Sequence, residues 1–485
     1  MTDQHQPFAV ISSVHAGPNL TDSPGGLPAC HIGSVAAPLG PRLVVAGTAS
    51  GVGKTTVATG LLAALRRAGH RPAAAKVGPD FIDPGYHSLA CGRPPRNLDA
   101  WLCGPQAVGP LAGRAGAGAG VLVVEGVMGL FDGASDGTAS STADVARMLG
   151  APVVLVVDAS AMSSSVAAMV HGYATFDPTV RVGGVILNQV GSDGHETLLR
   201  ESLGPTGVPV LGALRRDEGL RWRDRHLGLV PVAERPTEVE AALDRLAAQV
   251  AARVDLAAVM ALARSAPASA TGAVELPAPG PPARIAVAAG RAFTFTYTDT
   301  LEALEAAGAT VVPFDPLAEQ RLPGGIDGLI IGGGFPEVHA AELAANRPLL
   351  SDLAARVGRG LPTWAECGGL LLLTGDLDGH RLAGVVPARS EMTGQLTLGY
   401  RTATMGTATP LGPAGTSVRG HEFHYSRVDP PGDALTLVSR FGRRKEGWAT
   451  PDLLATYLHH HPGGDPSAVE HFVRRCALRG ALPGA

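Results

Sequence analysis

Short apolar runs alternate with longer amphipathic stretches from Arg42 onward. In the first half of the chain these runs are continuous rather than alternating, and they are rich in Val, Leu and Ala. They read LVVAG (43–47), AAAKVG (73–78), VLVVEG (121–126), VVLVVD (153–158), VGGVILN (182–188) and VPVLGAL (208–214). Continuous apolar runs separated by helices are typical of a parallel sheet that is buried on both faces. The pattern therefore predicts an α/β fold that begins with a doubly wound parallel sheet.

The helices of this first sheet are predicted at 53–68, 140–149, 163–173, 195–203 and 236–263. A segment rich in Pro, Ala and Gly follows at 265–283, and this composition is typical of a semi-rigid linker. A second α/β series begins after the linker. Its predicted strands are RIAVAA (284–289), ATVVPF (309–314), DGLIIGGG (327–334) and LPTWAE (361–366), and its predicted helices cover 299–307, 337–358 and 369–374.

These patterns divide the chain into four parts. Residues 1–40 mix Pro, Gly, Ser and His without a period, and we expect a flexible extension there. Residues 41–263 are expected to form the first domain, residues 264–283 the linker and residues 284–485 the second domain. The two α/β series are not repeats of each other, so we expect two domains with different chemistry.

The composition is that of a globular protein, with 45% hydrophobic and 17% charged residues. A formal charge of −4 provides no basic surface, so we expect no nucleic-acid partner. No apolar run approaches the roughly 20 residues that span a bilayer, and the N-terminal segment lacks the pattern of a signal peptide. We therefore expect a cytoplasmic protein without membrane contact. The five cysteines include no C-x-x-C pair, which argues against a disulfide or zinc framework.

The segment GTASGVGKTT (47–56) lies between the first apolar run and the first predicted helix. Backbone N–H groups in such a glycine-rich turn can surround phosphate oxygens at the positive end of a helix. We expect Lys54 to reach the β- and γ-phosphates of a nucleotide and Thr55 to bind magnesium through its hydroxyl. The expected nucleotide-binding residues are Ser50, Gly51, Gly53, Lys54, Thr55 and Thr56.

The phosphate loop departs from the common G-x-x-x-x-G-K-[ST] motif, which would place a glycine where this chain has Thr48. Partitioning ATPases of a variant group carry a second lysine at the position of Ala49. The loop instead resembles those of ATP-dependent carboxylate-activating enzymes, namely dethiobiotin synthetase and the cobyrinic acid amidases. The resemblance implies that ATP activates a carboxylate.

Four acidic residues follow strands of the first domain, namely Asp80, Asp83, Glu125 and Asp132. Phosphorylation of a carboxylate brings two anions together and needs a metal ion, which carboxylates can hold. Glu125 ends a predicted buried strand, and we expect it to bind Mg²⁺ together with Thr55. Asp80, Asp83 and Asp132 lie in predicted loops, and we expect them to position a substrate. The alternatives are a solvated acid at a strand end and ordinary turn residues beside proline.

Cys367 lies between a predicted strand and a glycine-led helix in TWAECGGLLLL (363–373). Such a turn exposes a nucleophile, and the helix N-terminus lowers the pKa of a thiol. A buried structural cysteine is the alternative. Gly333 and Gly334 follow another strand, and we expect their N–H groups to bind a tetrahedral oxyanion. Histidines in LLATYLHHH (453–461) could take a proton from Cys367.

Three segments of the first domain, KVGPDFIDPGYH (76–87), GRPPRNLDAW (92–101) and VEGVMGLFDG (124–133), resemble blocks of cobyrinic acid a,c-diamide synthases, including forms that act on hydrogenobyrinic acid. In that family the first domain binds ATP and the corrinoid. The resemblance implicates carboxylates at the positions of the four acids in magnesium binding and substrate activation. Phe81 stands where some members have tyrosine.

In the second domain the patterns G-G-G-x-P-E, A-E-C-G-G and Y-L-H-x-H resemble a class I glutamine amidotransferase of the cobyrinic and cobyric acid synthase type. The family pattern makes His459 the base. Ordinary class I glutaminases have a glutamate where this chain has His461, so the resemblance implies a Cys367–His459 dyad without that acid. The alternating pattern of RGHEFHYSR (419–427) predicts a strand, and we assign its His421 and His424 to structure or to contact between the domains rather than to catalysis.

The resemblance implies a glutamine-dependent ATP amidoligase of cobalamin biosynthesis, with ATP and glutamine as cosubstrates and Mg²⁺ as cofactor. Members of that family amidate the c and then the a side chain of a corrinoid, and the resemblance implies that the reaction passes through acyl phosphates. Cobyric acid synthase is the nearest rival, and a non-enzymatic partitioning-type ATPase switch is another. The sequence leaves open whether the substrate contains cobalt, lacks it or is a nickel-containing sirohydrochlorin. A homodimer is compatible with the sequence.

Overall fold

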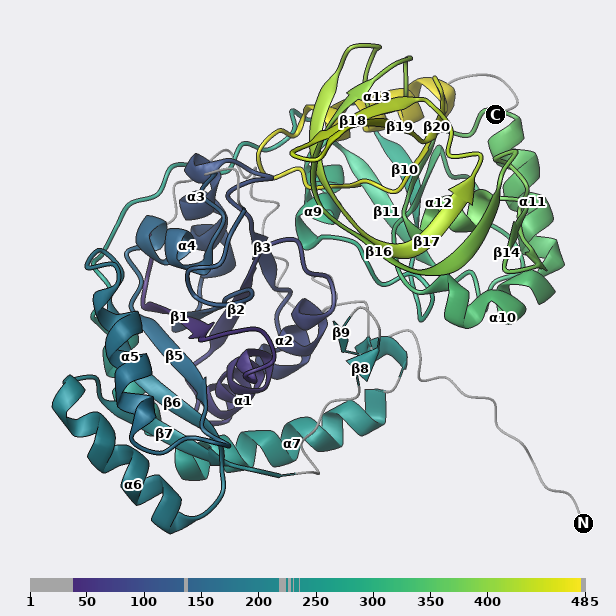
Figure 1. Cartoon of the computed structure of the whole chain (residues 1–485). Helices are drawn as coiled ribbons and strands as arrows, with labels where there is room; N and C mark the ends of the chain where they lie inside the picture. The colour runs from purple at the N-terminus through teal and green to yellow at the C-terminus, as the bar shows by residue number, and fades with distance from the viewer. Residues whose placement is uncertain are drawn as a thin grey trace, which may run out of the picture.

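The computed structural model describes residues 38–134, 138–217, 224–225, 228–229, 231–234 and 236–480. Within these residues the chain forms two α/β halves, each around its own mainly parallel sheet, and the halves lie side by side (Figure 1). Most of the extension expected at 1–40 lies outside the described residues. In the described part of the chain, no helix combines the length and the apolar character needed to cross a membrane.

The first half confirms the predicted doubly wound parallel sheet, in the order β3-β2-β4-β1-β5-β6-β7. Its strands are β1 (Arg42–Gly47), β2 (Pro72–Val77), β3 (Arg96–Leu98), β4 (Val121–Glu125), β5 (Val153–Asp158), β6 (Val182–Val190) and β7 (Val210–Arg215). Alternate residues of β1 pack into different apolar clusters on the two faces, Val44 and Ala46 on one and Leu43 and Val45 on the other. This burial on both faces explains why the runs are continuously apolar.

The helices of this half are α1 (Lys54–Arg67), α2 (Asp83–Cys91), α3 (Pro105–Ala115), α4 (Thr142–Leu149), α5 (Ser165–Thr175), α6 (Asp193–Leu203), α7 (Pro236–Arg253) and α8 (Leu256–Arg264). Of these helices, α2 and α3 were not predicted from the sequence. The single helix predicted at 236–263 is wrong, because Asp255 interrupts it and caps α8 by accepting a hydrogen bond from the N–H of Ala258. Short pieces, η1 (Gly204–Thr206), β8 (Asp224–Arg225), β9 (Gly228–Leu229) and η3 (Val232–Glu234), complete the described part of this half.

The second half contains a sheet in the order β11-β10-β12-β13-β21-β20, parallel except for its last pair. Its strands are β10 (Ala283–Ala288), β11 (Ala309–Phe314), β12 (Gly328–Ile331), β13 (Thr363–Glu366), β20 (Trp448–Thr450) and β21 (Leu453–Thr456). Its helices are α9 (Thr298–Ala306), α10 (Ala340–Ala345), α11 (Arg347–Gly358), α12 (Gly368–Leu373) and α13 (Ser467–Gly480). The helix predicted at 337–358 is divided, because η4 (Pro336–His339) precedes α10 and the Asn346 side chain caps α11.

A further sheet, mostly not predicted, covers the second half. It consists of β14 (Asp376–Leu377), β15 (His380–Arg381), β16 (Arg389–Met405), β17 (Ser417–Asp429), β18 (Leu435–Ser439), β19 (Gly442–Glu446) and β22 (His459–His460). The long antiparallel strands β16 and β17 curve across this half (Figure 1). Of these strands, only the part of β17 within 419–427 was predicted from the sequence.

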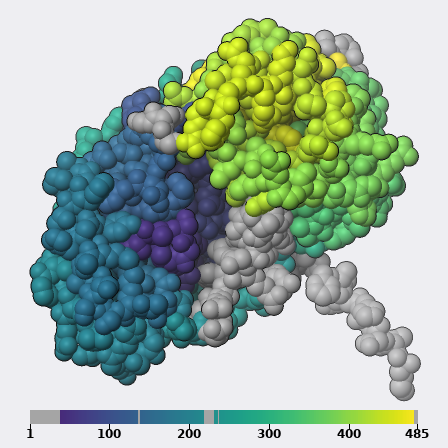
Figure 2. Space-filling model, in the orientation of Figure 1, coloured from purple at the N-terminus to yellow at the C-terminus, as the bar shows by residue number. Residues whose placement is uncertain are grey.

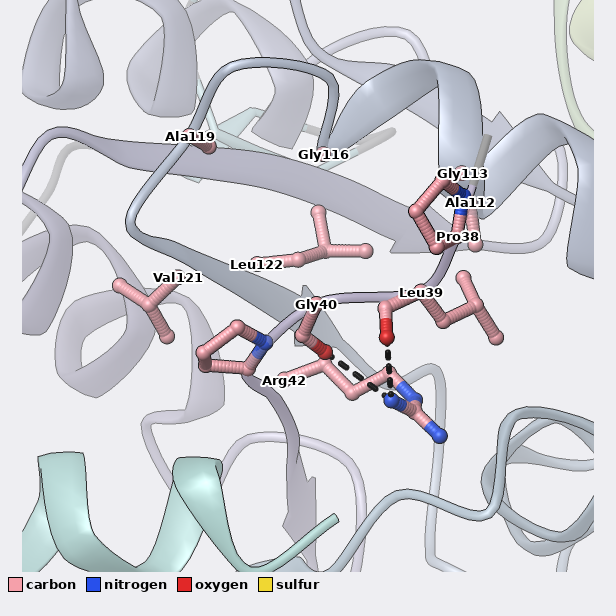
Figure 3. A pocket seen from close by; sticks show the side chains of 11 residues that line it. Pro38, Leu39, Gly40, Arg42, Ala112, Gly113, Gly116, Ala119, Val121 and Leu122 are labelled. Carbon is pink, nitrogen blue, oxygen red and sulfur yellow. Dashed lines mark hydrogen bonds between the residues drawn. The ribbon is translucent and has the colours of Figure 1, made fainter. Parts of the chain in front are cut away.

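A small hollow of about 10 Å³ adjoins the buried Arg42 at the start of β1 (Figure 3). Arg42 donates hydrogen bonds to the carbonyl oxygens of Leu39, Gly40, Leu149 and Pro267. These bonds tie the first described segment and the linker to the sheet. The hollow lies at the opposite end of β1 from the phosphate loop, and we assign Arg42 a structural role.

Candidate active site

The phosphate loop connects β1 to α1, as the sequence predicts. Gly51 and Gly53 have φ angles of 80° and 94°, in the left-handed region that favours glycine. A Cβ atom on Gly53 would also lie 2.1 Å from Nδ2 of Asn188, which donates to the carbonyl oxygen of Val52 at 2.9 Å. Ser50 and Gly51 are exposed, so the loop backbone is accessible to a ligand.

Lys54 begins α1, and Thr55 and Thr56 follow it. The Nζ atom of Lys54 donates to the carbonyl oxygen of Ala49, 2.8 Å away, so the lysine folds back over the loop. Burial and the neighbouring Lys76 lower the pKa of Lys54 to about 8, more than nearby carboxylates raise it. An anionic ligand at this point would raise this pKa again.

Thr55 lies within a buried cluster at the carboxyl ends of β1, β2 and β4. Its hydroxyl donates to Oε1 of Glu125 at 2.7 Å and is 3.2 Å from Oδ2 of Asp83. Lys76 joins these two carboxylates, with Nζ 2.7 Å from Asp83 and 2.9 Å from Glu125. The other carboxylate oxygen of Glu125 is 2.6 Å from Nε2 of His87.

The charges of this cluster favour a cation. Burial and the neighbouring Asp80 raise the pKa of Asp83 well above its usual range, although Lys76 opposes them. Burial alone would raise the pKa of Glu125, but Lys76 and His87 hold it well below its usual range. Carboxylate and hydroxyl oxygens are the ligands that Mg²⁺ prefers. Thr55, Asp83 and Glu125 therefore fit this ion, together with phosphate oxygens.

The three acids expected in loops occupy different places. Asp83 is the first residue of α2, so its placement in a loop was wrong. The N–H groups of Ile82 and Asp83 donate to Oδ1 of Asp80, so this carboxylate fixes the start of the helix. Asp132 does lie in a loop, where its carboxylate accepts a hydrogen bond from the N–H of Gly129 at 2.9 Å. The structure thus brings Asp83, rather than Asp80 or Asp132, to Thr55 and Glu125.

A cavity of about 680 Å³ lies between the two halves, close to this cluster. The first half contributes the loops after β2 and β4, including Asp80 and Phe81, and Trp101 after β3. The second half contributes β16, β17 and the end of β18, including Tyr400 and Arg440. Figure 2 shows the surface hollowed between the purple and blue first half and the yellow-green strands of the second.

The walls of the cavity are mainly apolar and aromatic. Met128, Leu398 and Phe441 line it although they are 41%, 52% and 79% exposed. Exposed apolar side chains gathered in one place are typical of a binding surface. The Trp101 and Tyr400 rings, one from each half, stack with their centroids 4.6 Å apart. The cavity thus suits a large and partly apolar ligand.

The glutaminase motifs also converge. Cys367 lies between β13 and α12 with φ 49° and ψ −103°, a strained conformation for a residue other than glycine and one that is typical of a nucleophile at a sharp turn. β13 pairs with β21, and this pairing brings the chain before His459 next to Cys367. Cys367 lies close enough to His459 to raise the pKa of its imidazole. A Cβ atom on Gly333 would lie 2.5 Å from the His459 ring.

The two candidate oxyanion donors differ. The N–H of Gly333 already donates to the carbonyl oxygen of Phe295 at 3.2 Å. Among the described residues, the N–H of Gly334 has no such partner, and a Cβ atom on Gly368 would lie 3.1 Å from its nitrogen. The geometry therefore favours Gly334 over Gly333 as an oxyanion donor.

Aromatic rings connect the cavity with the glutaminase residues. The Phe81 ring lies 4.9 Å from His459 and 4.3 Å from Tyr297, measured between ring centroids. His421 lines the cavity and pairs with His459 between β17 and β22. His424 stacks on Tyr457, with ring centroids 3.7 Å apart, and its Nδ1 atom is 2.8 Å from the carbonyl oxygen of Ser426, which agrees with a structural role.

Several residues of the site were not found from the sequence. Lys76 and His87 lie within the KVGPDFIDPGYH block, and Lys76 is one of few lysines in the chain, but no spacing rule connects either residue with Glu125. Asn188 ends a predicted strand and gives no other signal. Glu366 directly precedes Cys367 and lies beside His459, with Oε2 3.4 Å from Nδ1. Its place in the A-E-C-G-G pattern was the signal that could have identified it.

Known protein families match both halves of the chain. Residues 43–230 match the model of the CobQ/CobB/MinD/ParA nucleotide binding domain, and residues 284–466 match the model of the CobB/CobQ-like glutamine amidotransferase domain. Hydrogenobyrinate a,c-diamide synthase of Streptomyces coelicolor is 49% identical over 473 residues, which cover 90% of this chain and 97% of the relative.

Two further relatives match along similar lengths. Hydrogenobyrinate a,c-diamide synthase of Mycobacterium tuberculosis is 47% identical and cobyrinate a,c-diamide synthase of Syntrophotalea carbinolica 43% identical, each over 90% of this chain and 98% of the relative. Such identity along nearly the whole chain, together with a phosphate loop and a Cys–His pair in the matching halves, shows that the chain belongs to the hydrogenobyrinate and cobyrinate a,c-diamide synthase family.

Proposed function

We propose that the protein amidates the a and c carboxylates of hydrogenobyrinic or cobyrinic acid, with ATP and glutamine as cosubstrates, in cobalamin biosynthesis. The observation that carries the proposal is the cavity between the halves, which Asp80 and Phe81 line. The neighbour Asp83 reaches the phosphate-loop cluster, and Phe81 reaches His459. A substrate in this cavity would lie next to both chemistries. We place the enzyme in the cytoplasm, where ATP and glutamine are available.

The second half would release ammonia from glutamine. Sγ of Cys367 attacks the side-chain amide carbon to form a thioester, and the C–N bond of the amide breaks. His459 gives its proton to the leaving nitrogen, and water then hydrolyses the thioester to glutamate. The N–H of Gly334, which has no partner among the described residues, would bind the oxyanion that forms in each step.

The first half would activate the carboxylate. Lys54 and the loop N–H groups bind the phosphates of ATP, and the substrate carboxylate takes the γ-phosphoryl group to form an acyl phosphate. Mg²⁺, held by Thr55, Asp83 and Glu125, would neutralise charge on the phosphates. Ammonia attacks the acyl carbon, and phosphate leaves as the amide forms. Asp80 and Asp132 remain our candidates for positioning the substrate.

The relatives named above with the highest identity are hydrogenobyrinate synthases, and this favours the cobalt-free acid. The test incubates the protein with ATP, Mg²⁺, glutamine and either acid, and measures the product by mass spectrometry. We expect a diamide to form. Cys367→Ser should lose activity with glutamine and keep activity with high ammonium chloride. A product that carries amides at other side chains would instead identify a cobyric acid synthase.

A further inference from the structure

The glutaminase site lacks the acid that normally supports the catalytic imidazole, because His461 stands at that position. In the structure, the His461 side chain contacts the first half. Its Nδ1 atom lies 3.2 Å from Sγ of Cys103, across the boundary between the halves. Its Nε2 atom is 3.8 Å from Asp299. His461 therefore contributes to the contact between the halves and does not replace the missing acid.

Another carboxylate lies where the missing acid would act. His459 is buried, and its Nδ1 atom makes no well-aligned hydrogen bond within the described residues. Oε2 of Glu366 lies 3.4 Å from that nitrogen, at ion-pair distance. The other oxygen of Glu366 is fixed by two donors, Nε1 of Trp364 at 2.9 Å and the N–H of His460 at 3.0 Å. The carboxylate is thus held in one orientation, beside the imidazole.

We propose that Glu366 is a positioning residue for glutamine hydrolysis, which orients His459 and stabilises its imidazolium beside the thiolate of Cys367. The strand that ends in the nucleophile thereby also supplies the acid. In an ordinary class I glutaminase, this acid follows the histidine instead. The inference rests on the glutaminase activity proposed above.

The charges around His459 agree with this role. The titratable groups that face its ring are Cys367 after β13, Glu366 at the end of β13 and His421 on β17. Burial lowers the pKa of His459, but its contacts with Cys367 and Glu366 raise it to about 10. Burial and the neighbouring His459 lower the pKa of His421 to about 3, so this residue stays neutral at working pH. Glu366 is the carboxylate in this group.

The first test is Glu366→Gln, which keeps an oxygen for Trp364 and His460 and removes the charge. We expect kcat for glutamine hydrolysis to fall about 10- to 1000-fold, with little change in KM. The alkaline limb of the pH profile should move to lower pH, because the imidazolium loses its counter-charge. Glu366→Asp, which keeps the charge, should recover part of both effects. The matched control His461→Gln should keep the wild-type alkaline limb.

A second measurement does not depend on turnover. The rate at which iodoacetamide alkylates Cys367 reports how much thiolate is present, and Cys367→Ser supplies the blank. In Glu366→Gln the proton should return to the thiol, so alkylation near neutral pH should slow. Glu366→Gln with a wild-type kcat, pH profile and alkylation rate would overturn the inference. A wild-type protein without glutaminase activity would instead contradict the proposed function.

Discussion

At the scale of single residues, Lys54 links nucleotide binding to pH. Its Nζ atom is held by the loop carbonyl of Ala49, and its pKa is lowered to about 8. An ordinary lysine keeps its charge to about pH 10. Because this pKa is lowered, the cation is present below pH 8 and is lost as pH rises through that value. Phosphates would favour the charged form, so nucleotide binding should take up protons near pH 8.

We therefore predict that the affinity for ATP is nearly constant below about pH 7 and weakens by up to about ten-fold per pH unit above pH 8. Isothermal titration calorimetry in two buffers with different ionisation enthalpies would measure both the affinity and the proton uptake. Lys54→Arg is the control, because a guanidinium stays charged throughout this range. A flat profile in the wild type would contradict the prediction.

Substitutions of the four acids in the first half should fall into two groups according to their effect on the two amidations. Asp83 and Glu125 contact Thr55, so Asp83→Asn and Glu125→Gln should slow both amidations together. Asp80 lines the cavity, so Asp80→Asn should slow one amidation more than the other, and we expect the same of Asp132→Asn. The measurement is a time course of mono- and diamide by mass spectrometry. Accumulation of monoamide in Asp83→Asn would instead indicate that Asp83 positions the substrate.

At the scale of elements, the second half supplies a wall of the cavity between the halves through β16, β17 and β18. The guanidinium of Arg440 lies over the Phe441 ring, 4.4 Å from its centroid, at the rim of the cavity. Arg401 also lines the cavity, but its charge is paired with the buried Glu422. Arg440 is therefore the better candidate for contact with the carboxylates of a corrinoid.

We predict that Arg440→Glu raises KM for the corrinoid about ten-fold or more and leaves KM for ATP and glutamine unchanged. The reason is repulsion between the new carboxylate and those of the substrate. Arg389→Glu makes the same charge change at the far end of β16, where Arg389 is exposed and does not line the cavity. Steady-state kinetics of both variants would test the prediction. An equal rise in KM for the corrinoid in both variants would show that the effect comes from the net charge of the protein and not from Arg440.

The elements that the sequence predicted well are those with a single strong pattern. Strands such as β1 and β5 are buried along their length and lie among helices. The helix α2 was missed because Pro84 and Gly85 resemble a turn, although proline is well tolerated in the first turn of a helix. The strands β16 and β17 were mostly missed because β16 is largely exposed or half-buried and lacks a regular apolar face.

At the scale of the whole molecule, buried charges join the halves. Arg96 at the start of β3 contacts Asp299, and it is 2.6 Å from Glu302, both residues of α9. Arg114 is also 2.6 Å from Glu302. Removal of one partner from a buried pair leaves an uncompensated charge and costs about 3–5 kcal/mol. This network should therefore keep Cys367 and the phosphate loop at a fixed separation.

We predict that Arg96→Met lowers the melting temperature and uncouples the two reactions, so that more than one glutamine is hydrolysed for each amide formed. Parallel assays of glutamate and amide would measure this ratio. Asp299→Asn, added to Arg96→Met, should restore part of the stability, because it removes one of the charges left unpaired. An unchanged ratio in Arg96→Met would show that coupling does not depend on this network.

The candidate site could be predicted from the sequence where its residues lie in continuous motifs, as Lys54, Thr55 and Cys367 do. Contacts between distant segments could not be predicted, because no local pattern reports them. Lys76 with Glu125 and Cys103 with His461 are examples. The oxyanion donors show an intermediate case, since the G-G-G motif locates the turn but not which N–H already has a partner.

The contact between Phe81 and His459 constrains how such enzymes can be recombined. The Phe81 ring lines the cavity and also packs against His459 of the other half. A chimera can join the first half of one relative to the second half of another. Its aromatic rings at this contact would then come from two enzymes and would not be matched to each other. Successful exchanges should therefore transfer the loop around Phe81 together with Phe295 and Tyr297, which pack on it. The aromatic contact between the halves, rather than either half alone, would therefore be the unit to exchange.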